Sequence, residues 1–417
     1  MNAPPRAAEP GRRTALSQLG GDIETEGAAA DVEVLRQAFA VPATETAELR
    51  DVHAFHSYPA RMHPETAARL VAAWSTPGQT VLDPFCGSAT VLVEARRLGR
   101  TARGFDVNPL SRELCWLKTL APDAAFINAL TAAAARIAAH ADSRRERKAG
   151  ATERYGDADR EQFAPHVLLE LDGLRDGIRH VADAAVKRAA LLVLSALLTK
   201  FSQKGGDSSA RPSTKRVAPG APSRFFINKT EELCRQLAEY SGSLALGSPT
   251  AECTLGDARR LPGLRPRSVT LVVSSPPYPG VYDYLTHHDD RLRWLGLPAE
   301  DFEKLEIGSR RELSGEGFGP ALARWERDLG ATLTALERGL TEEGRIVLLI
   351  ADSTLAQRPL YADRVVTKLA PSVGLSLTAR ASQGRPHFHA GSRDAFARKP
   401  RREHLLLLRP DRAQRPR

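Results

Sequence analysis

A strand, a glycine-bearing turn, a helix and a second strand follow one another within residues 79–107, and this order limits the possible folds of the chain more than any other feature. Residues 79–85 have the apolar character of a buried strand, and Gly87 stands in the turn after it. Residues 88–98 have helical character, and residues 101–107 read as the next strand. A unit of this kind predicts an α/β fold with a parallel sheet.

Five more segments have strand character, so seven strands are expected in all. They are residues 253–256, 268–274, 345–351, 376–381 and 403–408. The stretch before them has mainly helical character and a loop rich in Gly, Ser and Pro. The expected organisation is an α/β domain made of 46–108 and 250–410, a helical insertion at 109–249, a mostly disordered segment at 1–45 and a basic tail at 411–417.

Composition excludes several classes of protein. The four cysteines stand far apart with no CxxC pair, so neither a disulfide framework nor a zinc site is expected, and no metal is predicted. The first residues carry no apolar core after their charges, and the longest apolar run, residues 189–198, contains Ser195 and ends before Lys200. Neither a signal peptide nor a membrane span is expected, and a cytoplasmic protein fits best.

The net charge of +9 is concentrated in two segments. Residues 187–229 contain nine basic residues and one acid, and residues 393–417 contain nine basic residues and three acids. Neutralising the phosphates of a nucleic acid requires positive charge gathered in this way. A flexible basic linker and a solvated basic tail would have the same composition, so both interpretations stay open.

Acidic side chains stand at the ends of three successive strands. Asp83 ends the first strand beside the glycine turn, and Asp106 ends the second, about 20 residues after Gly87, where a carboxylate can accept hydrogen bonds from two ribose hydroxyls. Asp257 ends the third, where it can accept from the exocyclic amine of an adenine. The pattern predicts a ligand at the carboxyl edge of the sheet.

The loop Ser275-Pro276-Pro277-Tyr278 directly follows a buried strand. The exocyclic amine of a base is a weak nucleophile because its lone pair is delocalised into the ring, so acceptors must make the nitrogen more tetrahedral. The Ser275 hydroxyl and the Pro276 carbonyl can accept its two protons, while the prolines fix the backbone. The Tyr278 ring offers a stacking face worth ~1–3 kcal/mol. An ordinary proline turn is the alternative.

Three stretches in this order carry a family resemblance. They read YPARMHP at 58–64, DPFCGSAT at 83–90 and SPPY at 275–278. Over roughly residues 55–410 the chain resembles the S-adenosylmethionine-dependent DNA amino-methyltransferases, which modify cytosine or adenine. Its SPPY form resembles the N(4)-cytosine group more than the adenine group, where an acid commonly replaces the serine. The resemblance implies a Rossmann-like, seven-stranded class I methyltransferase sheet and S-adenosyl-L-methionine as cofactor.

The resemblance also implies roles for two sets of residues. The cofactor-binding set contacts the methionine part, the ribose and the adenine of the donor, or closes the pocket from the other side: Tyr58, Pro59, Asp83, Pro84, Phe85, Gly87, Ser88, Asp106 and Asp257. The catalytic set holds the target base: Ser275, Pro276, Pro277 and Tyr278. Ala89 stands where the family usually has a second glycine, which predicts a weaker grip on the donor.

The implied activity is site-specific methylation of double-stranded DNA at a base flipped out of the helix. The favoured target is N(4) of cytosine, the insertion is the candidate DNA-reading region, and a cognate restriction enzyme is a possible partner. N(6) of adenine is the first alternative target. An RNA amino-methyltransferase acting on tRNA, and a DNA-binding protein that keeps the fold without catalysis, are the others.

Overall fold

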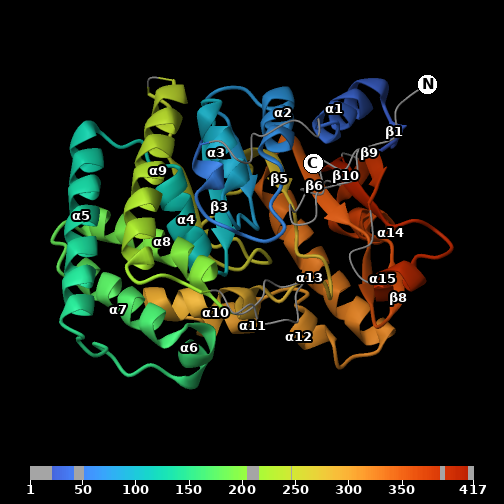
Figure 1. Cartoon of the computed structure of the whole chain (residues 1–417). Coiled ribbons are helices and arrows are strands. Elements are labelled where there is room, and N and C mark those ends of the chain that lie inside the picture. The colour runs from blue at the N-terminus through green and yellow to red at the C-terminus, as the bar shows by residue number, and fades with distance from the viewer. Residues whose placement is uncertain (1–20, 42–50, 204–215, 246, 386–389, 412–417) are drawn as a thin grey trace, which may run out of the picture.

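The computed structural model describes residues 21–41, 51–203, 216–245, 247–385 and 390–411, and an eight-stranded sheet runs through its centre (Figure 1). The sheet has the order β1-β9-β10-β6-β5-β2-β3-β4. Its strands are β1 (Ile23–Gly27), β2 (Thr80–Asp83), β3 (Thr101–Asp106), β4 (Ala251–Leu255), β5 (Val269–Ser274), β6 (Leu340–Ala351), β9 (Leu375–Gly384) and β10 (Arg402–Pro410). A separate hairpin pairs β7 (Ser353–Leu355) with β8 (Arg358–Leu360).

The direction of the strands identifies the fold. β2 is parallel to β3 and β5, β3 is parallel to β4, and β5 is parallel to β6, whereas β10 lies antiparallel between β6 and β9. All seven strands expected from the sequence are present, so the Rossmann-like class I methyltransferase sheet is confirmed. This order brings the carboxyl ends of β2, β3, β4 and β5 to one edge.

Two hydrophobic cores lie on opposite faces of the sheet, because successive side chains of a strand point to opposite sides. Val81 and Leu271 face one core, which is covered by α1 (Ala29–Phe39), α2 (Pro64–Trp74) and α3 (Thr90–Arg97). Leu82 and Val272 face the other, which is covered by α13 (Phe318–Gly339) and α14 (Ala362–Leu369). Burial on both faces explains the continuous apolar runs of the central strands.

Residues 21–41 of the segment 1–45 form a strand and a helix, and the expectation of disorder for the rest of this segment falls outside the described chain. β1 pairs antiparallel with residues 379–383 of β9, and Leu35 and Phe39 of α1 are buried against the sheet. The strand sequence IETEG is polar, so it carries little signal of its own. Its order comes from the ladder to β9 and from pairs such as Glu24 with Arg402, which are tertiary contacts.

The insertion stands between β3 and β4 and forms a layer beyond the sheet, on the left of Figure 1. Its helices are α4 (Pro109–Lys118), α5 (Ala124–Glu146), α6 (Asp157–Gln162), α7 (Pro165–Arg179), α8 (Ala184–Phe201) and α9 (Ala221–Ser243). A Cβ on Gly173 or Gly177 would lie 3.2 Å from the α5 backbone at Ala141 or Ile137, so these glycines let α7 pack closely on α5. The proposed domain limits remain predictions.

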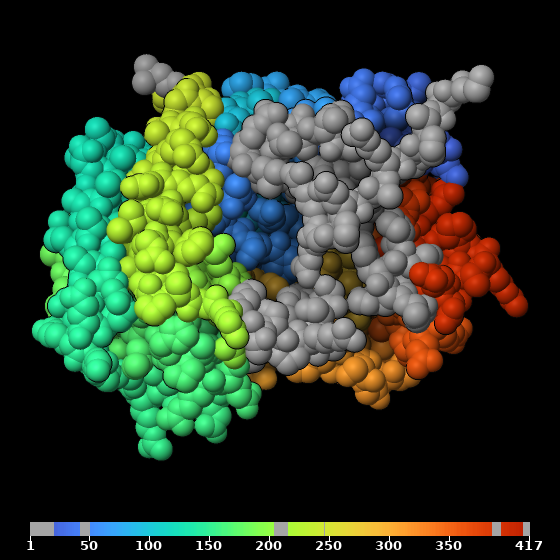
Figure 2. All heavy atoms as spheres, viewed as in Figure 1, coloured from blue at the N-terminus to red at the C-terminus, as the bar shows by residue number. Residues whose placement is uncertain are grey.

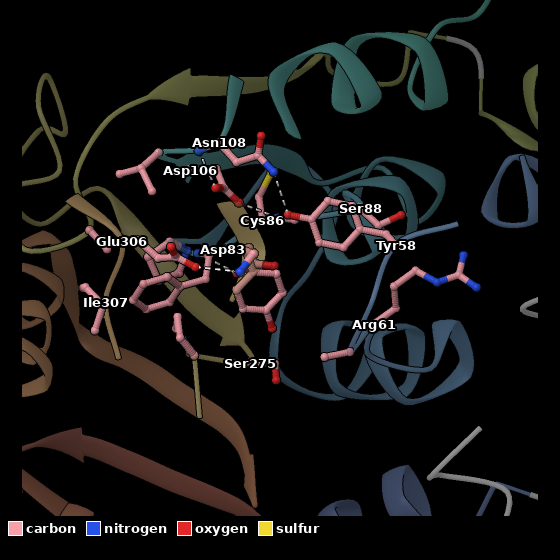
Figure 3. A pocket seen from close by; sticks show the side chains of 18 of the residues that line it. Tyr58, Arg61, Asp83, Cys86, Ser88, Asp106, Asn108, Ser275, Glu306 and Ile307 are labelled. Atoms are coloured by element: carbon pink, nitrogen blue, oxygen red, sulfur yellow. Dashed lines mark hydrogen bonds between the residues drawn. The ribbon is translucent and has the colours of Figure 1, made fainter. Parts of the chain in front are cut away.

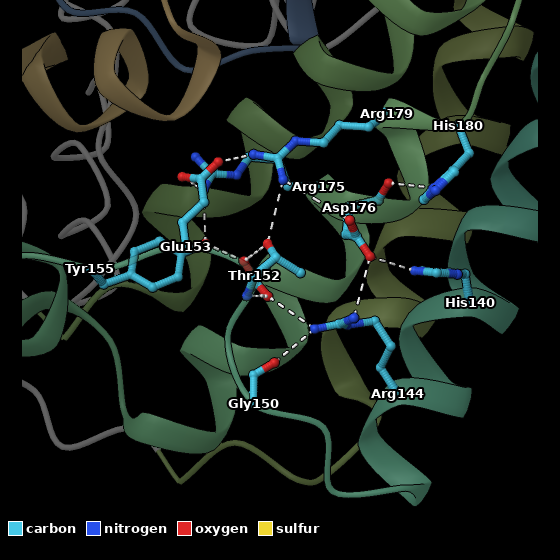
Figure 4. A network of polar contacts seen from close by, with 11 residues as sticks. His140, Arg144, Gly150, Thr152, Glu153, Tyr155, Arg175, Asp176, Arg179 and His180 are labelled. Carbon is cyan, nitrogen blue, oxygen red and sulfur yellow. Dashed lines mark hydrogen bonds and ion pairs between the residues drawn. The ribbon is translucent and has the colours of Figure 1, made fainter.

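Polar contacts fasten the loop before α6 to the helices (Figure 4). Asp172 accepts hydrogen bonds from the Thr152 amide at 2.9 Å and from the Tyr155 hydroxyl at 2.7 Å. Asp176 pairs with His140 at 2.8 Å and with Arg144 at 3.4 Å. These contacts fix the end of the insertion that lies farthest from the sheet.

One described helix, α5, is long and apolar enough to span a membrane by length and composition alone. The same test is met by core helices of globular proteins, and the buried face of α5 packs against α7 and α9. In Figure 2 this helix and α9 form one flank of the molecule, beside the recessed blue surface of the N-terminal half.

Three further helices follow the SPPY loop and lie under the edge of the sheet in Figure 1. They are α10 (Tyr284–Leu295), α11 (Glu300–Leu305) and α12 (Arg310–Leu313). A short helix, α15 (Ala390–Ala395), precedes β10, and the one-turn 3-10 helices η3 (Asp51–Ala54) and η4 (Ala370–Val373) complete the described elements. The residues 1–20 and the tail 412–417 lie outside the described chain.

Candidate functional site

A cavity that opens to solvent lies at the carboxyl edge of the parallel strands (Figure 3). All nine residues predicted to bind the cofactor line it, and so do Ser275 and Pro277 of the predicted base loop. The fold thus brings together segments near residues 58, 85, 106, 257 and 275 that are far apart in the sequence.

The glycine turn joins β2 to α3 and faces the cavity. Gly87 has φ +47°, a left-handed conformation that favours glycine, and its amide donates to Asp106 Oδ2 at 2.7 Å. The Asp83 carboxyl accepts from the Ser274 hydroxyl at 2.6 Å and from the Phe85 amide at 3.1 Å. Burial raises the pKa of Asp83 to about 7. The turn is therefore fixed by two strand-end carboxyl groups.

Two more acids approach the cavity from β3 and β4. Asp106 also accepts from the Asn108 amide at 2.9 Å, and burial raises its pKa. Asp257 accepts from the Arg259 guanidinium at 2.9 Å, and Arg259 reaches Asp328 at 2.7 Å. An adenine amine that binds Asp257 would therefore share the carboxylate with Arg259. The sequence alone does not reveal this ion pair.

Tyr58 covers the glycine turn from the opposite side. A Cβ on Gly87 would lie 3.2 Å from Tyr58 Cε1, so only a glycine leaves room for this ring. The Tyr58 hydroxyl lies 3.2 Å from Ser111 Oγ and accepts from Asn108 Nδ2 at 3.3 Å. Its ring centroid is 4.6 Å from that of the buried His288 on α10. Tyr58 therefore connects the turn to the helix that follows the base loop.

The base loop is divided between the cavity and the core. Ser275 and Pro277 line the cavity, whereas Pro276 and Tyr278 do not. Tyr278 is buried, and its hydroxyl lies 3.3 Å from Glu403 Oε1 and 3.4 Å from both Ser275 Oγ and the Leu349 carbonyl oxygen. In this arrangement the ring does not present a face to the cavity, in contrast to the stacking role predicted for it.

Two features were not predicted from the sequence: a lysine that holds the cavity residue Ser88, and a glutamate in the cavity wall. Lys118, from α4, is buried and donates to the Ser88 carbonyl at 3.2 Å and to its hydroxyl at 2.6 Å. Burial and the charges of Arg61 and Lys229 hold its pKa well below the usual range. Glu306, after α11, is buried and lines the cavity beside Ile307. Neither stands in a motif, so only the fold reveals them.

Ala89 does not line the cavity, although its neighbours Ser88 and Thr90 do. It is fully buried in the core that α2 and α3 cover, and its φ of 63° is the left-handed conformation that favours glycine. The expected weakening of donor binding stays a prediction.

Two groups of side chains with metal-ligating chemistry lie outside the cavity in the described part of the chain. They are His140, Asp176 and His180 on the insertion, and Asp352, Asp363 and His404 in the core. Asp352 accepts from the Ala362 amide at 3.0 Å and lies 3.2 Å from His404 Nε2, which accounts for this pair as a structural contact.

Comparison with known proteins finds a match in the N-terminal part of the chain. Residues 25–114 match the family model described as DNA methylase. They include the glycine turn, Tyr58 and Asp106. A stretch of 79 residues is 38% identical to the Type II methyltransferase M.MvaI of Kocuria varians, and it makes up 18% of this chain and 17% of that protein. The chain thus matches less than a fifth of this curated relative.

Solved methyltransferase structures are more distant. A TehB-like SAM-dependent methyltransferase from Corynebacterium glutamicum is 11% identical over 82% of this chain and 86% of its own, with a TM-score of 0.29. The rRNA methyltransferase aviRa from Streptomyces viridochromogenes is 13% identical over 90% of this chain and 96% of its own, with a TM-score of 0.33. Because these TM-scores are below 0.5, the description of the fold rests on the strand order of this chain and not on these structures. The methylase match over residues 25–114 agrees with the predicted family and with S-adenosyl-L-methionine as the predicted cofactor.

Proposed function

We propose that this protein is a site-specific DNA methyltransferase that modifies the exocyclic amine of a base, with N(4) of cytosine as the favoured target. The observation that carries the proposal is the shared cavity, where the donor residues of the methylase family and Ser275 of the base loop meet. S-adenosylmethionine supplies an electrophilic methyl group there. Asp106 would hold its ribose, Asp257 its adenine and the turn from Asp83 to Ser88 its methionine part.

The base loop would activate and orient the amine. The Ser275 hydroxyl and the Pro276 carbonyl accept its protons, and Trp325 fixes the loop by donating to the Pro277 carbonyl at 3.3 Å. A base inside a duplex cannot reach this cavity, so the target base is flipped out of the stack. Stacking on Tyr278 additionally requires the loop to turn this buried ring outward.

The insertion would hold the DNA beside the cavity. Lys200 at the end of α8 lies 4.3 Å from the ring centroid of Phe225 on α9, and Phe225 is one of the exposed large apolar side chains of the described chain. Positive charge beside an exposed aromatic ring suits a nucleic-acid surface. A cognate restriction enzyme would be the partner in a type II system.

Transfer of a radiolabelled methyl group from the donor to DNA tests this function. We expect label in duplex DNA and, after digestion to nucleosides, in N(4)-methylcytosine. Ser275→Ala should lower the transfer rate by about 10²-fold, the loss typical for one preorganised hydrogen-bonding group. Ser372→Ala, at an exposed serine, is the matched control.

Each alternative gives a different result in the same assay. Label in N(6)-methyladenine would retain the DNA methyltransferase and overturn the choice of cytosine. Label in tRNA and none in DNA would make the protein an RNA methyltransferase. DNA binding that Ser275→Ala leaves unchanged, without transfer to any substrate by the wild type, would show a non-catalytic DNA-binding protein.

A further inference from the structure

Glu306 lies beside the base loop although it stands 31 positions after Ser275 in the sequence. The backbone on its C-terminal side runs alongside the loop: the Gly280 amide donates to the Gly308 carbonyl at 3.0 Å, and the Arg310 amide donates to the Tyr282 carbonyl at 2.9 Å. The fold therefore fixes Glu306 against the segment that holds the target base.

The carboxylate of Glu306 is only partly satisfied by the protein. Its Oε1 accepts from the Tyr284 amide at 2.7 Å, which holds the side chain toward the cavity. Its Oε2 is buried and accepts no hydrogen bond, and the Arg311 guanidinium stands 3.7 Å away. A buried carboxylate oxygen without a donor is costly, so this atom is suited to a donor on a ligand.

Burial and the nearby Asp283 raise the pKa of Glu306 to about 7, against the lowering effects of the Tyr284 amide, Arg311 and the Leu285 amide. A carboxyl group of this kind is half ionised at neutral pH. It can therefore accept a proton there and release it to solvent, which a serine hydroxyl cannot do.

We propose that Glu306 is a catalytic residue whose Oε2 accepts the proton that the target amine loses during methyl transfer. The amine nitrogen bonds to the methyl carbon, the sulfur of the donor keeps the electron pair of the broken C–S bond, and one N–H proton bonds to Oε2. The products are the methylated base, the neutral thioether and the protonated Glu306. This inference rests on the proposed function.

The other cavity carboxylates are less suited to this step. Asp257 is paired with Arg259, and the Oδ2 atom of Asp106 accepts from the Gly87 amide at the donor turn. Asp83 Oδ1 accepts both from the Ser274 hydroxyl and from the Phe85 amide. Ser275 lines the same cavity as Glu306, so the two divide the work: Ser275 orients the amine and Glu306 takes its proton.

Glu306→Gln tests this assignment, because glutamine keeps the acceptor for the Tyr284 amide and removes the base. The pH dependence of kcat for methyl transfer to DNA is measured with donor affinity by calorimetry. We expect kcat to fall by about 10²-fold or more, donor Kd to stay within about threefold, and the limb near pH 7 to disappear. Acetate should partly restore the activity of Glu306→Ala.

Glu303→Gln, at an exposed glutamate on α11, is the matched control and should behave as the wild type. A Glu306→Gln enzyme with wild-type kcat and an intact limb near pH 7 overturns the inference and leaves the methyltransferase standing. A variant that loses donor affinity instead shows that Glu306 binds the donor, which also overturns it. A wild type that methylates no DNA overturns the proposed function and this inference with it.

Discussion

The turn between β2 and α3 has a glycine at position 87, and we expect a larger residue there to disturb the turn. Gly87→Ala places a Cβ 3.2 Å from the Tyr58 ring and forces alanine into a left-handed conformation, which costs ~1–2 kcal/mol. We expect donor affinity by calorimetry to fall at least about fivefold. Gly242→Ala, where nothing lies within 4 Å, is the control. Unchanged affinity in Gly87→Ala would show that the turn does not carry the donor.

The buried amine of Lys118 makes a prediction about pH. Its pKa in the folded protein is well below the ordinary 10.5, so the unfolded chain binds this proton more tightly than the folded protein does. This unequal proton binding destabilises the fold at neutral pH, and its effect disappears as pH rises past 10.5. We therefore expect the free energy of unfolding of the wild type to rise relative to that of Lys118→Met as the pH increases from 7 to 10.5.

Denaturant unfolding at several pH values checks this difference, with Lys304→Met at an exposed lysine as the control. A difference that does not change with pH would contradict the lowered pKa of this buried amine. Donor affinity measured on the same samples reports the second role of Lys118, which is to hold Ser88. Loss of both hydrogen bonds to Ser88, at ~1 kcal/mol for each bond, should weaken donor binding by up to about 30-fold.

Among the elements, β1 depends most on its neighbours. Gly27 has φ +127°, and a Cβ there would lie 2.5 Å from the Thr378 carbonyl of β9. Gly27→Ala should therefore displace the end of β1 and lower the free energy of unfolding by ~1–3 kcal/mol, while donor affinity stays unchanged. Gly319→Ala, in open space on α13, is the control. Equal stability of both variants would show that β1 adds little to the fold.

The elements also show what the sequence can and cannot reveal. The seven strands and the donor turn were predictable because buried parallel strands leave continuous apolar runs and because the turn needs a glycine. β1 was missed because its polar residues gain order only from pairing with β9. Glu306 and Lys118 were missed because their roles arise where separate segments meet. The burial of Tyr278 depends on contacts with β6 and β10 that no local pattern contains.

For the molecule as a whole, the insertion and the cavity lead to a prediction about salt. Lys200→Glu removes a positive charge beside the exposed Phe225 on the insertion. We expect weaker DNA binding and a slope of log K against log salt that is shallower by ~0.9 for each DNA phosphate that the variant no longer neutralises. Donor affinity should not change. Lys368→Glu, on α14 and paired with Glu326, is the control.

The two basic segments differ in how they are used. In the C-terminal segment, Arg402 pairs with Glu24, and Arg409 pairs with Asp31 at 2.8 Å. These two basic residues therefore stabilise the N-terminal strand and helix, and DNA binding is expected to depend on the insertion. An equal loss of DNA binding from Lys200→Glu and from Arg398→Glu, at an exposed arginine of the C-terminal segment, would contradict this division.

The central claim is that the donor residues and the Ser275 loop form one site that methylates an amine in DNA. Methylation-sensitive sequencing, with nucleoside mass spectrometry, of DNA from cells that carry the wild type, Ser275→Ala or no gene tests it most directly. The account predicts N(4)-methylcytosine within one sequence motif in wild-type cells, and its loss in both other strains. DNA without any modified motif in cells that contain the folded wild-type protein would contradict it.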